Sequence, residues 1–127
     1  DTAGRDSREL RTGMTVADVL ISPARPSQYD LDTLPHLAEV YSQAKDLNPK
    51  LAGYLVLNLC PTNPVIKEVA AAQEFLADYP EFKLANTLVY DRKAYRDAIS
   101  EGKSVLEWTD AKAKHEIEAL VGEIING

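Results

Sequence analysis

The sequence predicts an α/β fold in which a mostly parallel β-sheet is flanked by helices. Short apolar runs, rich in β-branched residues and bounded by proline, alternate with longer segments whose apolar residues recur every three or four positions. Strands separated by helices of this length are typical of βαβ units, in which right-handed crossovers make neighbouring strands parallel. No repeat, low-complexity tract or Gly/Ser-rich linker interrupts the chain. We therefore expect residues 1–127 to form a single layered α/β domain.

The first strand and helix are expected in residues 15–23 and 30–47. The first segment is a continuous run of β-branched and other apolar residues that ends at Pro23, which predicts a strand buried on both faces. In the second, apolar residues recur at helical spacing, so one face of this helix should pack against the sheet. Asp30 or Asp32 is expected to cap its first turn.

The middle of the chain contains another strand, a helix and a short third strand. Residues 54–57 form a continuous apolar run, and the strand is expected to end near Cys60. Residues 63–80 then show helical spacing, with Asn63 followed by a proline at a favourable first helical position. Residues 83–91 predict the third strand.

Two further helices are expected in residues 91–102 and 109–127. Gly102 ends the first of them, and Thr109 or Asp110 should cap the second. One face of the last helix is apolar and carries Ile117, Leu120, Val121 and Ile124.

Composition limits the function classes that remain open. Fourteen Lys and Arg against twenty Asp and Glu give a formal net charge of −6, so any nucleic-acid contact must come from a local basic patch. The single Cys60 cannot form an internal disulfide. No run approaches the roughly 18 apolar residues of a membrane span, and the polar first residues do not form a signal peptide. These features predict a soluble, cytoplasmic protein without a membrane partner.

A D-x-x-G motif at the start of the chain is a candidate for phosphate chemistry. In such a motif a carboxylate, here Asp1, orients Mg²⁺ or its water, and a glycine, here Gly4, lets a backbone amide approach the γ-phosphate. Four letters alone also describe an ordinary polar turn. His36 and His115 lack the spacing of metal ligands, so no histidine metal site is expected.

A small basic cluster near residue 94 is the candidate contact for DNA or a protein partner. It consists of Arg92, Lys93 and Arg96, with aspartates on both sides. Phosphate contacts need only a few well-placed cations, which makes nonspecific DNA binding conceivable despite the acidic chain.

Together with the D-x-x-G motif, the segment RKAYRDAISEGKSVLEWTDAKAKHEIEAL (residues 92–120) resembles the C-terminal half of the ParA/MinD family of deviant-Walker ATPases. Within that family it is similar to the small ParF-like plasmid partition proteins. The resemblance covers essentially the whole chain and implies the C-terminal part of a P-loop NTPase fold. It also implies an ATPase that uses ATP and Mg²⁺, forms a dimer or polymer of itself, and acts in DNA segregation with a centromere-binding partition protein and possible nonspecific DNA contact.

The resemblance also suggests roles for individual residues. Asp1 corresponds to the carboxylate that acts on Mg²⁺, through water, and Gly4 to the glycine that faces the γ-phosphate. Asn58 is similar to the asparagine that hydrogen-bonds adenine, because an amide offers both a donor and an acceptor. Its alternative role is to cap local backbone groups at the strand end. Tyr90 or Asp91 would line the adenine pocket, in a segment similar to the loop that closes over the base.

The main departure from the family is the missing phosphate-binding loop. No G-x-x-x-x-G-K-[ST] motif occurs in the 127 residues, so this chain alone is not expected to hydrolyse ATP. The abrupt start within D-x-x-G favours a C-terminal piece of a longer ATPase over a natural short protein that keeps a partner surface. Such a piece would expose sheet edges and tend to associate.

Two rival functions stay open. One is a non-enzymatic α/β protein-interaction module that binds no nucleotide. The other is a different ATPase of the ParA/MinD superfamily, such as one associated with conjugative transfer. A MinD-like membrane helix is disfavoured because residues 101–127 contain six acidic and three basic side chains.

Overall fold

Three parallel strands form the centre of the structure. The computed structural model describes residues 7–27, 31–63 and 67–127. The strands lie in the order β1, β2, β3, and each neighbouring pair is parallel. Their bounds are β1 Val19–Ala24, β2 Ala52–Leu57 and β3 Lys83–Leu84. In the register, Tyr54 of β2 lies between Ile21 of β1 and Lys83 of β3. The predicted α/β class with a parallel sheet is confirmed.

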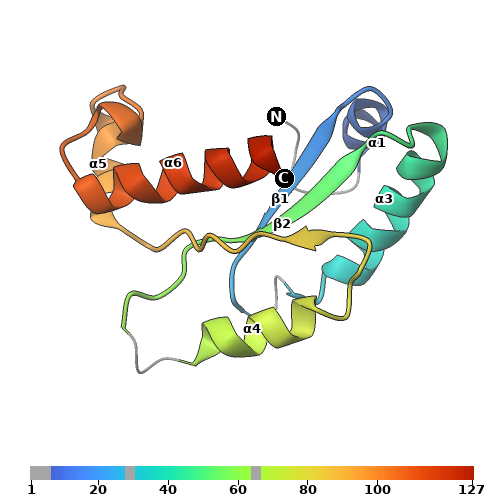
Figure 1. Ribbon diagram of the computed structural model, residues 1–127, viewed down its shortest axis with the longest axis horizontal. Coiled ribbons are helices and arrows are strands. Elements are labelled where there is room, and N and C mark those ends of the chain that lie inside the picture. Colours follow the sequence, from blue (N-terminus) through green and yellow to red (C-terminus); the bar gives the residue numbers. More distant parts are fainter. Residues whose placement is uncertain (1–6, 28–30, 64–66) are drawn as a thin grey trace.

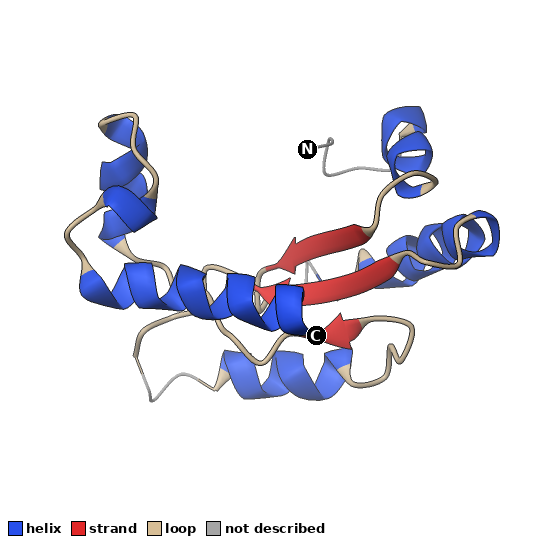
Figure 2. Ribbon diagram, turned by 45° about the horizontal axis from the view of Figure 1, so that its top comes forward, coloured by secondary structure: helices blue, strands red, loops and turns tan. Residues whose placement is uncertain are grey.

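Helices cover the sheet from two sides (Figures 1 and 2). Leu55 and Leu57 of β2 share a buried cluster with side chains of α3 and α4, whereas Val56 packs with Leu120 of α6. Because successive side chains of a strand point to opposite faces, α3 and α4 lie on one face and α6 on the other. The described helices are α1 Arg8–Met14, α3 Leu34–Leu47, α4 Glu68–Leu76, α5 Lys93–Ser100, the 3₁₀ turn η1 Val105–Glu107 and α6 Ala111–Asn126.

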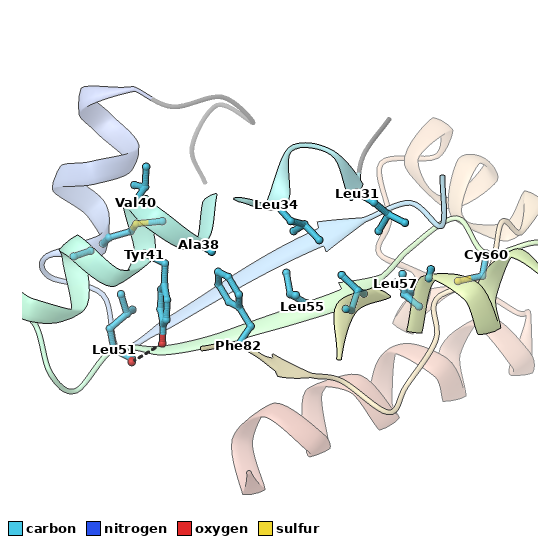
Figure 3. Close-up of a cluster of buried hydrophobic side chains, with 14 residues drawn as sticks. Leu31, Leu34, Ala38, Val40, Tyr41, Leu51, Leu55, Leu57, Cys60 and Phe82 are labelled. Carbon is cyan, nitrogen blue, oxygen red and sulfur yellow. Dashed lines mark hydrogen bonds between the residues drawn. The ribbon is translucent and has the colours of Figure 1, made fainter. Parts of the chain in front are cut away.

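The larger hydrophobic cluster joins α1, α3 and α4 to the sheet (Figure 3). At its centre the rings of Tyr41 and Phe82 stack with centroids 4.6 Å apart, and the Tyr41 hydroxyl donates to the Leu51 carbonyl at 3.2 Å. Gly53 permits this packing, because a Cβ there would lie 2.8 Å from the Tyr41 ring and 2.9 Å from the Phe82 ring. The packing of this cluster therefore requires the Tyr41 and Phe82 rings to lie directly against the backbone of Gly53.

The expectation that the first strand is buried on both faces is wrong. β1 begins at Val19, and the side chains of Val19 and Ile21 are 39% and 47% exposed. β1 pairs with β2 along one edge, and the described part of the chain places no strand along its other edge. α6 packs over β2 and the segment after β3, so it leaves this face of β1 uncovered.

Two helix starts differ from the prediction and one agrees. α3 follows Thr33 instead of Asp32, because its proline occupies the first turn, where no N–H donor is needed; Asp30 lies outside the described residues. The described part of α4 begins after Lys67 instead of at Asn63. At α6 the predicted cap is confirmed: the Asp110 carboxylate accepts from the amides of residues 112 and 113 at 2.9 and 3.1 Å.

The third strand is much shorter than predicted. Regular pairing ends at Leu84, and the chain returns to β2 only where the Val89 amide donates to the Leu57 carbonyl at 3.0 Å and Tyr90 bridges Cys60. Between these points the backbone leaves the ladder at residues 86–88. The irregular segment 85–92 carries several of the predicted site residues.

Candidate functional site

The candidate site lies beyond the carboxyl end of β2, where residues 58–60 run beside residues 89–91. The Cys60 amide donates to the Val89 carbonyl at 3.0 Å, and the Asp91 amide donates to the Cys60 carbonyl at 2.9 Å. Ligands of open α/β sheets bind in crevices outside the carboxyl ends of the strands. The predicted residues Asn58, Tyr90 and Asp91 are thus brought together at a favourable edge of the sheet.

Asn58 forms a tight local turn at the strand end. Its backbone amide donates to the Ala24 carbonyl at 2.9 Å, which extends the β1–β2 ladder by one bond. Its side-chain Oδ1 accepts from the Leu59 amide at 2.9 Å. Leu59 has a φ of +53°, a left-handed conformation that costs a non-glycine residue about 1–2 kcal/mol. The side-chain oxygen of Asn58 therefore caps the local backbone, which is the alternative role given above. The side-chain nitrogen is the group that can still bind a ligand.

A buried glutamate on α6 organises the opposite wall. Glu116 is 7% exposed, and its Oε1 accepts from the Tyr90 amide at 2.7 Å and from the Tyr95 hydroxyl at 2.8 Å. Its Oε2 lies 3.0 Å from Arg92 Nε and 2.9 Å from Arg92 Nη2. This two-pronged geometry is the strong form of an arginine–carboxylate pair.

The cations of the predicted basic cluster all have carboxylate partners. Arg92 pairs with Glu116 and places its guanidinium 5.1 Å from the Tyr90 ring centroid. On the surface, Arg96 Nη1 lies 2.7 Å from Asp91 Oδ1, and Lys93 Nζ lies 3.7 Å from an oxygen of Asp97. The structure thus separates the cluster into one half-buried cation and two exposed ones.

Two adjoining cavities share the side chains of Tyr90 and Arg92. The smaller has a volume of about 300 Å³ and is lined by Asn58, Leu59, Val89, Tyr90, Asp91, Arg92, Tyr95, Arg96 and Ile117. The larger, about 490 Å³, is lined by Pro61, Thr62, Asn63, Val69, Leu88, Tyr90, Arg92 and Lys112. We call the smaller one the Asn58 cavity. It combines an amide, charged groups and apolar walls, which is the composition of a small-molecule site.

Titratable groups next to the Asn58 cavity are shifted by burial and by Glu116. Burial, followed by the hydrogen bond to Glu116 and its negative charge, raises the pKa of the Tyr95 phenol well above its usual range. Burial and the charge of Glu116 raise the pKa of the Cys60 thiol to about 11. Both groups are therefore neutral at physiological pH, and Cys60 behaves as a small apolar core residue.

The described residues contain no group of three or more His, Cys, Asp or Glu side chains arranged to hold a metal ion. The predicted Mg²⁺ ligand Asp1 and the predicted phosphate-facing Gly4 lie outside the described residues. Their roles stay predictions. In the same part of the chain, none of the helices is both long and apolar enough to cross a membrane.

The chain as a whole has a similarity to a curated protein. No model of a known protein family matches the chain. It is similar to the maintenance of carboxysome distribution protein A of Halothiobacillus neapolitanus, with 30% identity over 115 residues. The match covers 88% of this chain and 51% of that protein, so the chain spans about half the length of the curated relative. This similarity supports the predicted relationship of the chain to the ParA/MinD family.

The lining of the Asn58 cavity can be tested against the predicted ligand, an adenine base. The residues present fit a base on chemical grounds: the Asn58 amide nitrogen is a donor, Tyr95 and Tyr90 offer aromatic surface, and Leu59 and Ile117 offer apolar surface. A polar heterocycle needs this mixture of flat apolar walls and a few fixed polar groups.

Sequence reasoning missed the residues that shape the cavity. Glu116 lies in the segment of residues 92–120 that resembles the ParA/MinD family but was given no role, and Leu59 was overlooked. A signal for Glu116 was available: it falls on the same helical face as Ala113 and Leu120, where a charged residue must find partners. No pattern in the sequence signals the left-handed backbone of Leu59.

Proposed function

We propose that this chain is the base-binding, C-terminal part of a ParA-type ATPase that positions or segregates a cellular cargo. In the intact protein ATP and Mg²⁺ would supply the energy and the switch between assembly states. The match to half the length of a carboxysome-distribution protein supports a positioning ATPase in general. Plasmid partition, with ParF-like character, is the specific form that the motifs of residues 92–120 favour.

The observation that carries the proposal is the meeting of Asn58, Tyr90 and Asp91 in one cavity. These residues were assigned to adenine from the sequence alone, and Tyr90 lies 32 positions after Asn58 in the chain. The fold nevertheless places all three around a space of about 300 Å³ at the carboxyl edge of the sheet. An interaction module without a nucleotide site gives no reason for this arrangement.

Three residues of the cavity and two at the start of the chain have specific roles in this proposal. Asn58 donates a hydrogen bond from its amide nitrogen to the base, while its oxygen stays on the Leu59 amide. Leu59 and Ile117 exclude water from the faces of the base. Asp1 and Gly4 would serve Mg²⁺ and the γ-phosphate, in a protein whose phosphate loop lies outside this chain.

The partners follow from the same proposal. The intact protein would assemble with a second copy of itself and with a centromere-binding partition protein, and its exposed cations would contact DNA without sequence preference. The name of the curated relative points to a second kind of cargo, a carboxysome, and its distribution in the cell. A cargo of protein instead of DNA is therefore the second candidate.

Nucleotide titration of the isotope-labelled chain tests the proposal. We expect MgATP at millimolar concentration to shift the amide resonances of residues 58–59 and 90–92, and MgGTP to shift them less. Asn58→Ala should weaken MgATP binding roughly 3- to 10-fold, because one hydrogen bond to the base is lost.

Asn126→Ala, at the exposed end of α6, is the matched control and should bind like the wild type. The proposal fails if MgATP shifts no resonance of the Asn58 cavity. It also fails if Asn58→Ala and Asn126→Ala bind MgATP equally well.

A further inference from the structure

Glu116 is the buried charged residue of the described core. Its side chain is 7% exposed, and both of its oxygens are occupied by donors from the opposite segment. All of these donors come from residues 90–95, more than twenty positions earlier in the chain. One carboxylate thus connects α6 to the end of the segment that follows β3 and to the start of α5.

Burying a carboxylate is expensive, and its purpose is seldom stability. Desolvation of an ion pair often cancels the attraction between its charges, and apolar residues of similar volume can stabilise a fold as well. What a fully bonded carboxylate gives instead is fixed geometry, since each oxygen holds its donors at a defined distance and angle.

The residues that Glu116 holds are those that line the Asn58 cavity. Tyr90, Arg92 and Tyr95 all contribute to its wall, whereas Glu116 itself lies behind them. Ile117, the next residue on α6, also lines the cavity. The position of α6 and the width of the cavity are therefore set by the same contacts.

We propose that Glu116 is a positioning residue for nucleotide-base recognition. It fixes Tyr90, Arg92 and Tyr95 as the wall that would hold a base against the Asn58 amide nitrogen. That nitrogen is a donor, which N1 of adenine can accept and the protonated N1 of guanine cannot, so the cavity should favour adenine. This role rests on the proposed function, because it assumes that a base occupies the cavity.

Glu116→Gln tests the role, since it keeps the size of the side chain and removes the charge that pairs with Arg92. We expect the ratio of MgGTP to MgATP dissociation constants to fall by about tenfold in this variant. Glu118→Gln, on the exposed side of the same helix, is the matched control and should keep the wild-type ratio. A general loss of stability would weaken both nucleotides equally and leave the ratio unchanged.

Tyr95→Phe keeps the test decisive if Glu116→Gln does not fold. It removes only the hydroxyl that donates to Oε1 of Glu116. The ratio of MgGTP to MgATP dissociation constants should then fall by about threefold. The amide proton of Tyr90 gives a readout without nucleotide: its exchange with solvent should accelerate in folded Glu116→Gln but not in Glu118→Gln.

The outcomes separate the two proposals. If the wild-type chain binds MgATP and folded Glu116→Gln keeps both the selectivity and the slow exchange of Tyr90, the role of Glu116 is overturned while the base site stands. If the wild-type chain binds neither nucleotide in the cavity, the proposed function fails, and the role of Glu116 in base selection fails with it.

Discussion

At the scale of single residues, a strained backbone at Leu59 lies in the wall of the Asn58 cavity. A leucine at φ +53° is unfavourable, and such strained residues persist only where surrounding contacts over-determine them. Here the Asn58 side chain supplies the contact by accepting from the strained residue's own amide. In this conformation the Leu59 side chain lines the cavity, where it contributes apolar surface.

Cys60 gives a prediction about pH at the same scale. Burial and the charge of Glu116 raise the pKa of its thiol to about 11, so the folded chain holds this proton after the unfolded chain has lost it. The stabilisation is fully present below the pKa of the unfolded thiol and is lost as the pH rises through about 11. The free energy of unfolding, measured by urea titration, should fall from pH 9 to 11. In Cys60→Ala this fall should be smaller, and an equal fall in both proteins would contradict the prediction.

At the scale of elements, α6 replaces the hydrogen bonds that β3 fails to make. Where residues 86–88 leave the ladder, Glu123 accepts from the amides of Asn86 and Thr87 at 2.6 and 2.9 Å. Two helical turns earlier, Glu116 accepts from the Tyr90 amide. Two carboxylates seven residues apart thus hold an irregular segment in the way a neighbouring strand would, because they supply acceptors for the amides of residues 86, 87 and 90.

Glu123→Gln should show this directly. Burial opposes ionisation of Glu123, but the hydrogen bonds from residues 86 and 87 outweigh it and lower the pKa of the carboxyl. The stability that ionised Glu123 contributes is present above the pKa of the unfolded carboxyl. It is lost as the pH falls through the lower pKa of the folded carboxyl. We expect the substitution to lower the free energy of unfolding at pH 7 by about 1 kcal/mol, since this partly exposed carboxylate is screened by solvent. The difference from wild type should shrink in acid; Glu118→Gln is the control, and a loss that stays constant with pH would refute the assignment.

The success of sequence reasoning also differs between elements. β2 and α6 were predicted closely, because a continuous apolar run and an Asp110 cap are local signals that the fold does not override. The burial of β1 was predicted wrongly, because its apolar run says nothing about which neighbours cover it. In the candidate site, Asn58, Tyr90 and Asp91 were named from the resemblance. How close these residues lie to one another depends on the irregular path of residues 85–92 and on Glu116. Such tertiary contacts leave no periodic signal in a single sequence.

At the scale of the whole molecule, the charge distribution limits how DNA could be bound. The Arg92–Glu116 pair is largely buried, so Arg92 is committed to the cavity wall. Lys93 and Arg96 are 82% and 64% exposed, and exposed pairs are worth only about 0–1 kcal/mol, so phosphate can replace their aspartate partners at little cost. In a chain of net charge −6, these two cations alone give a weak and strongly salt-dependent contact.

The uncovered face and edge of β1 lead to the last prediction, which concerns association. Val19 and Ile21 lie on one exposed face of an edge strand, and exposed strand edges with apolar side chains favour pairing with another chain. We expect the mean mass of the purified chain in sedimentation experiments to rise with concentration, and Ile21→Lys to weaken this association by about tenfold through lost apolar burial and added charge. Ile99→Lys, at a more exposed position on α5, removes the same type of side chain away from the sheet and should associate like the wild type. Equal association of the two variants would show that contact between chains does not involve β1.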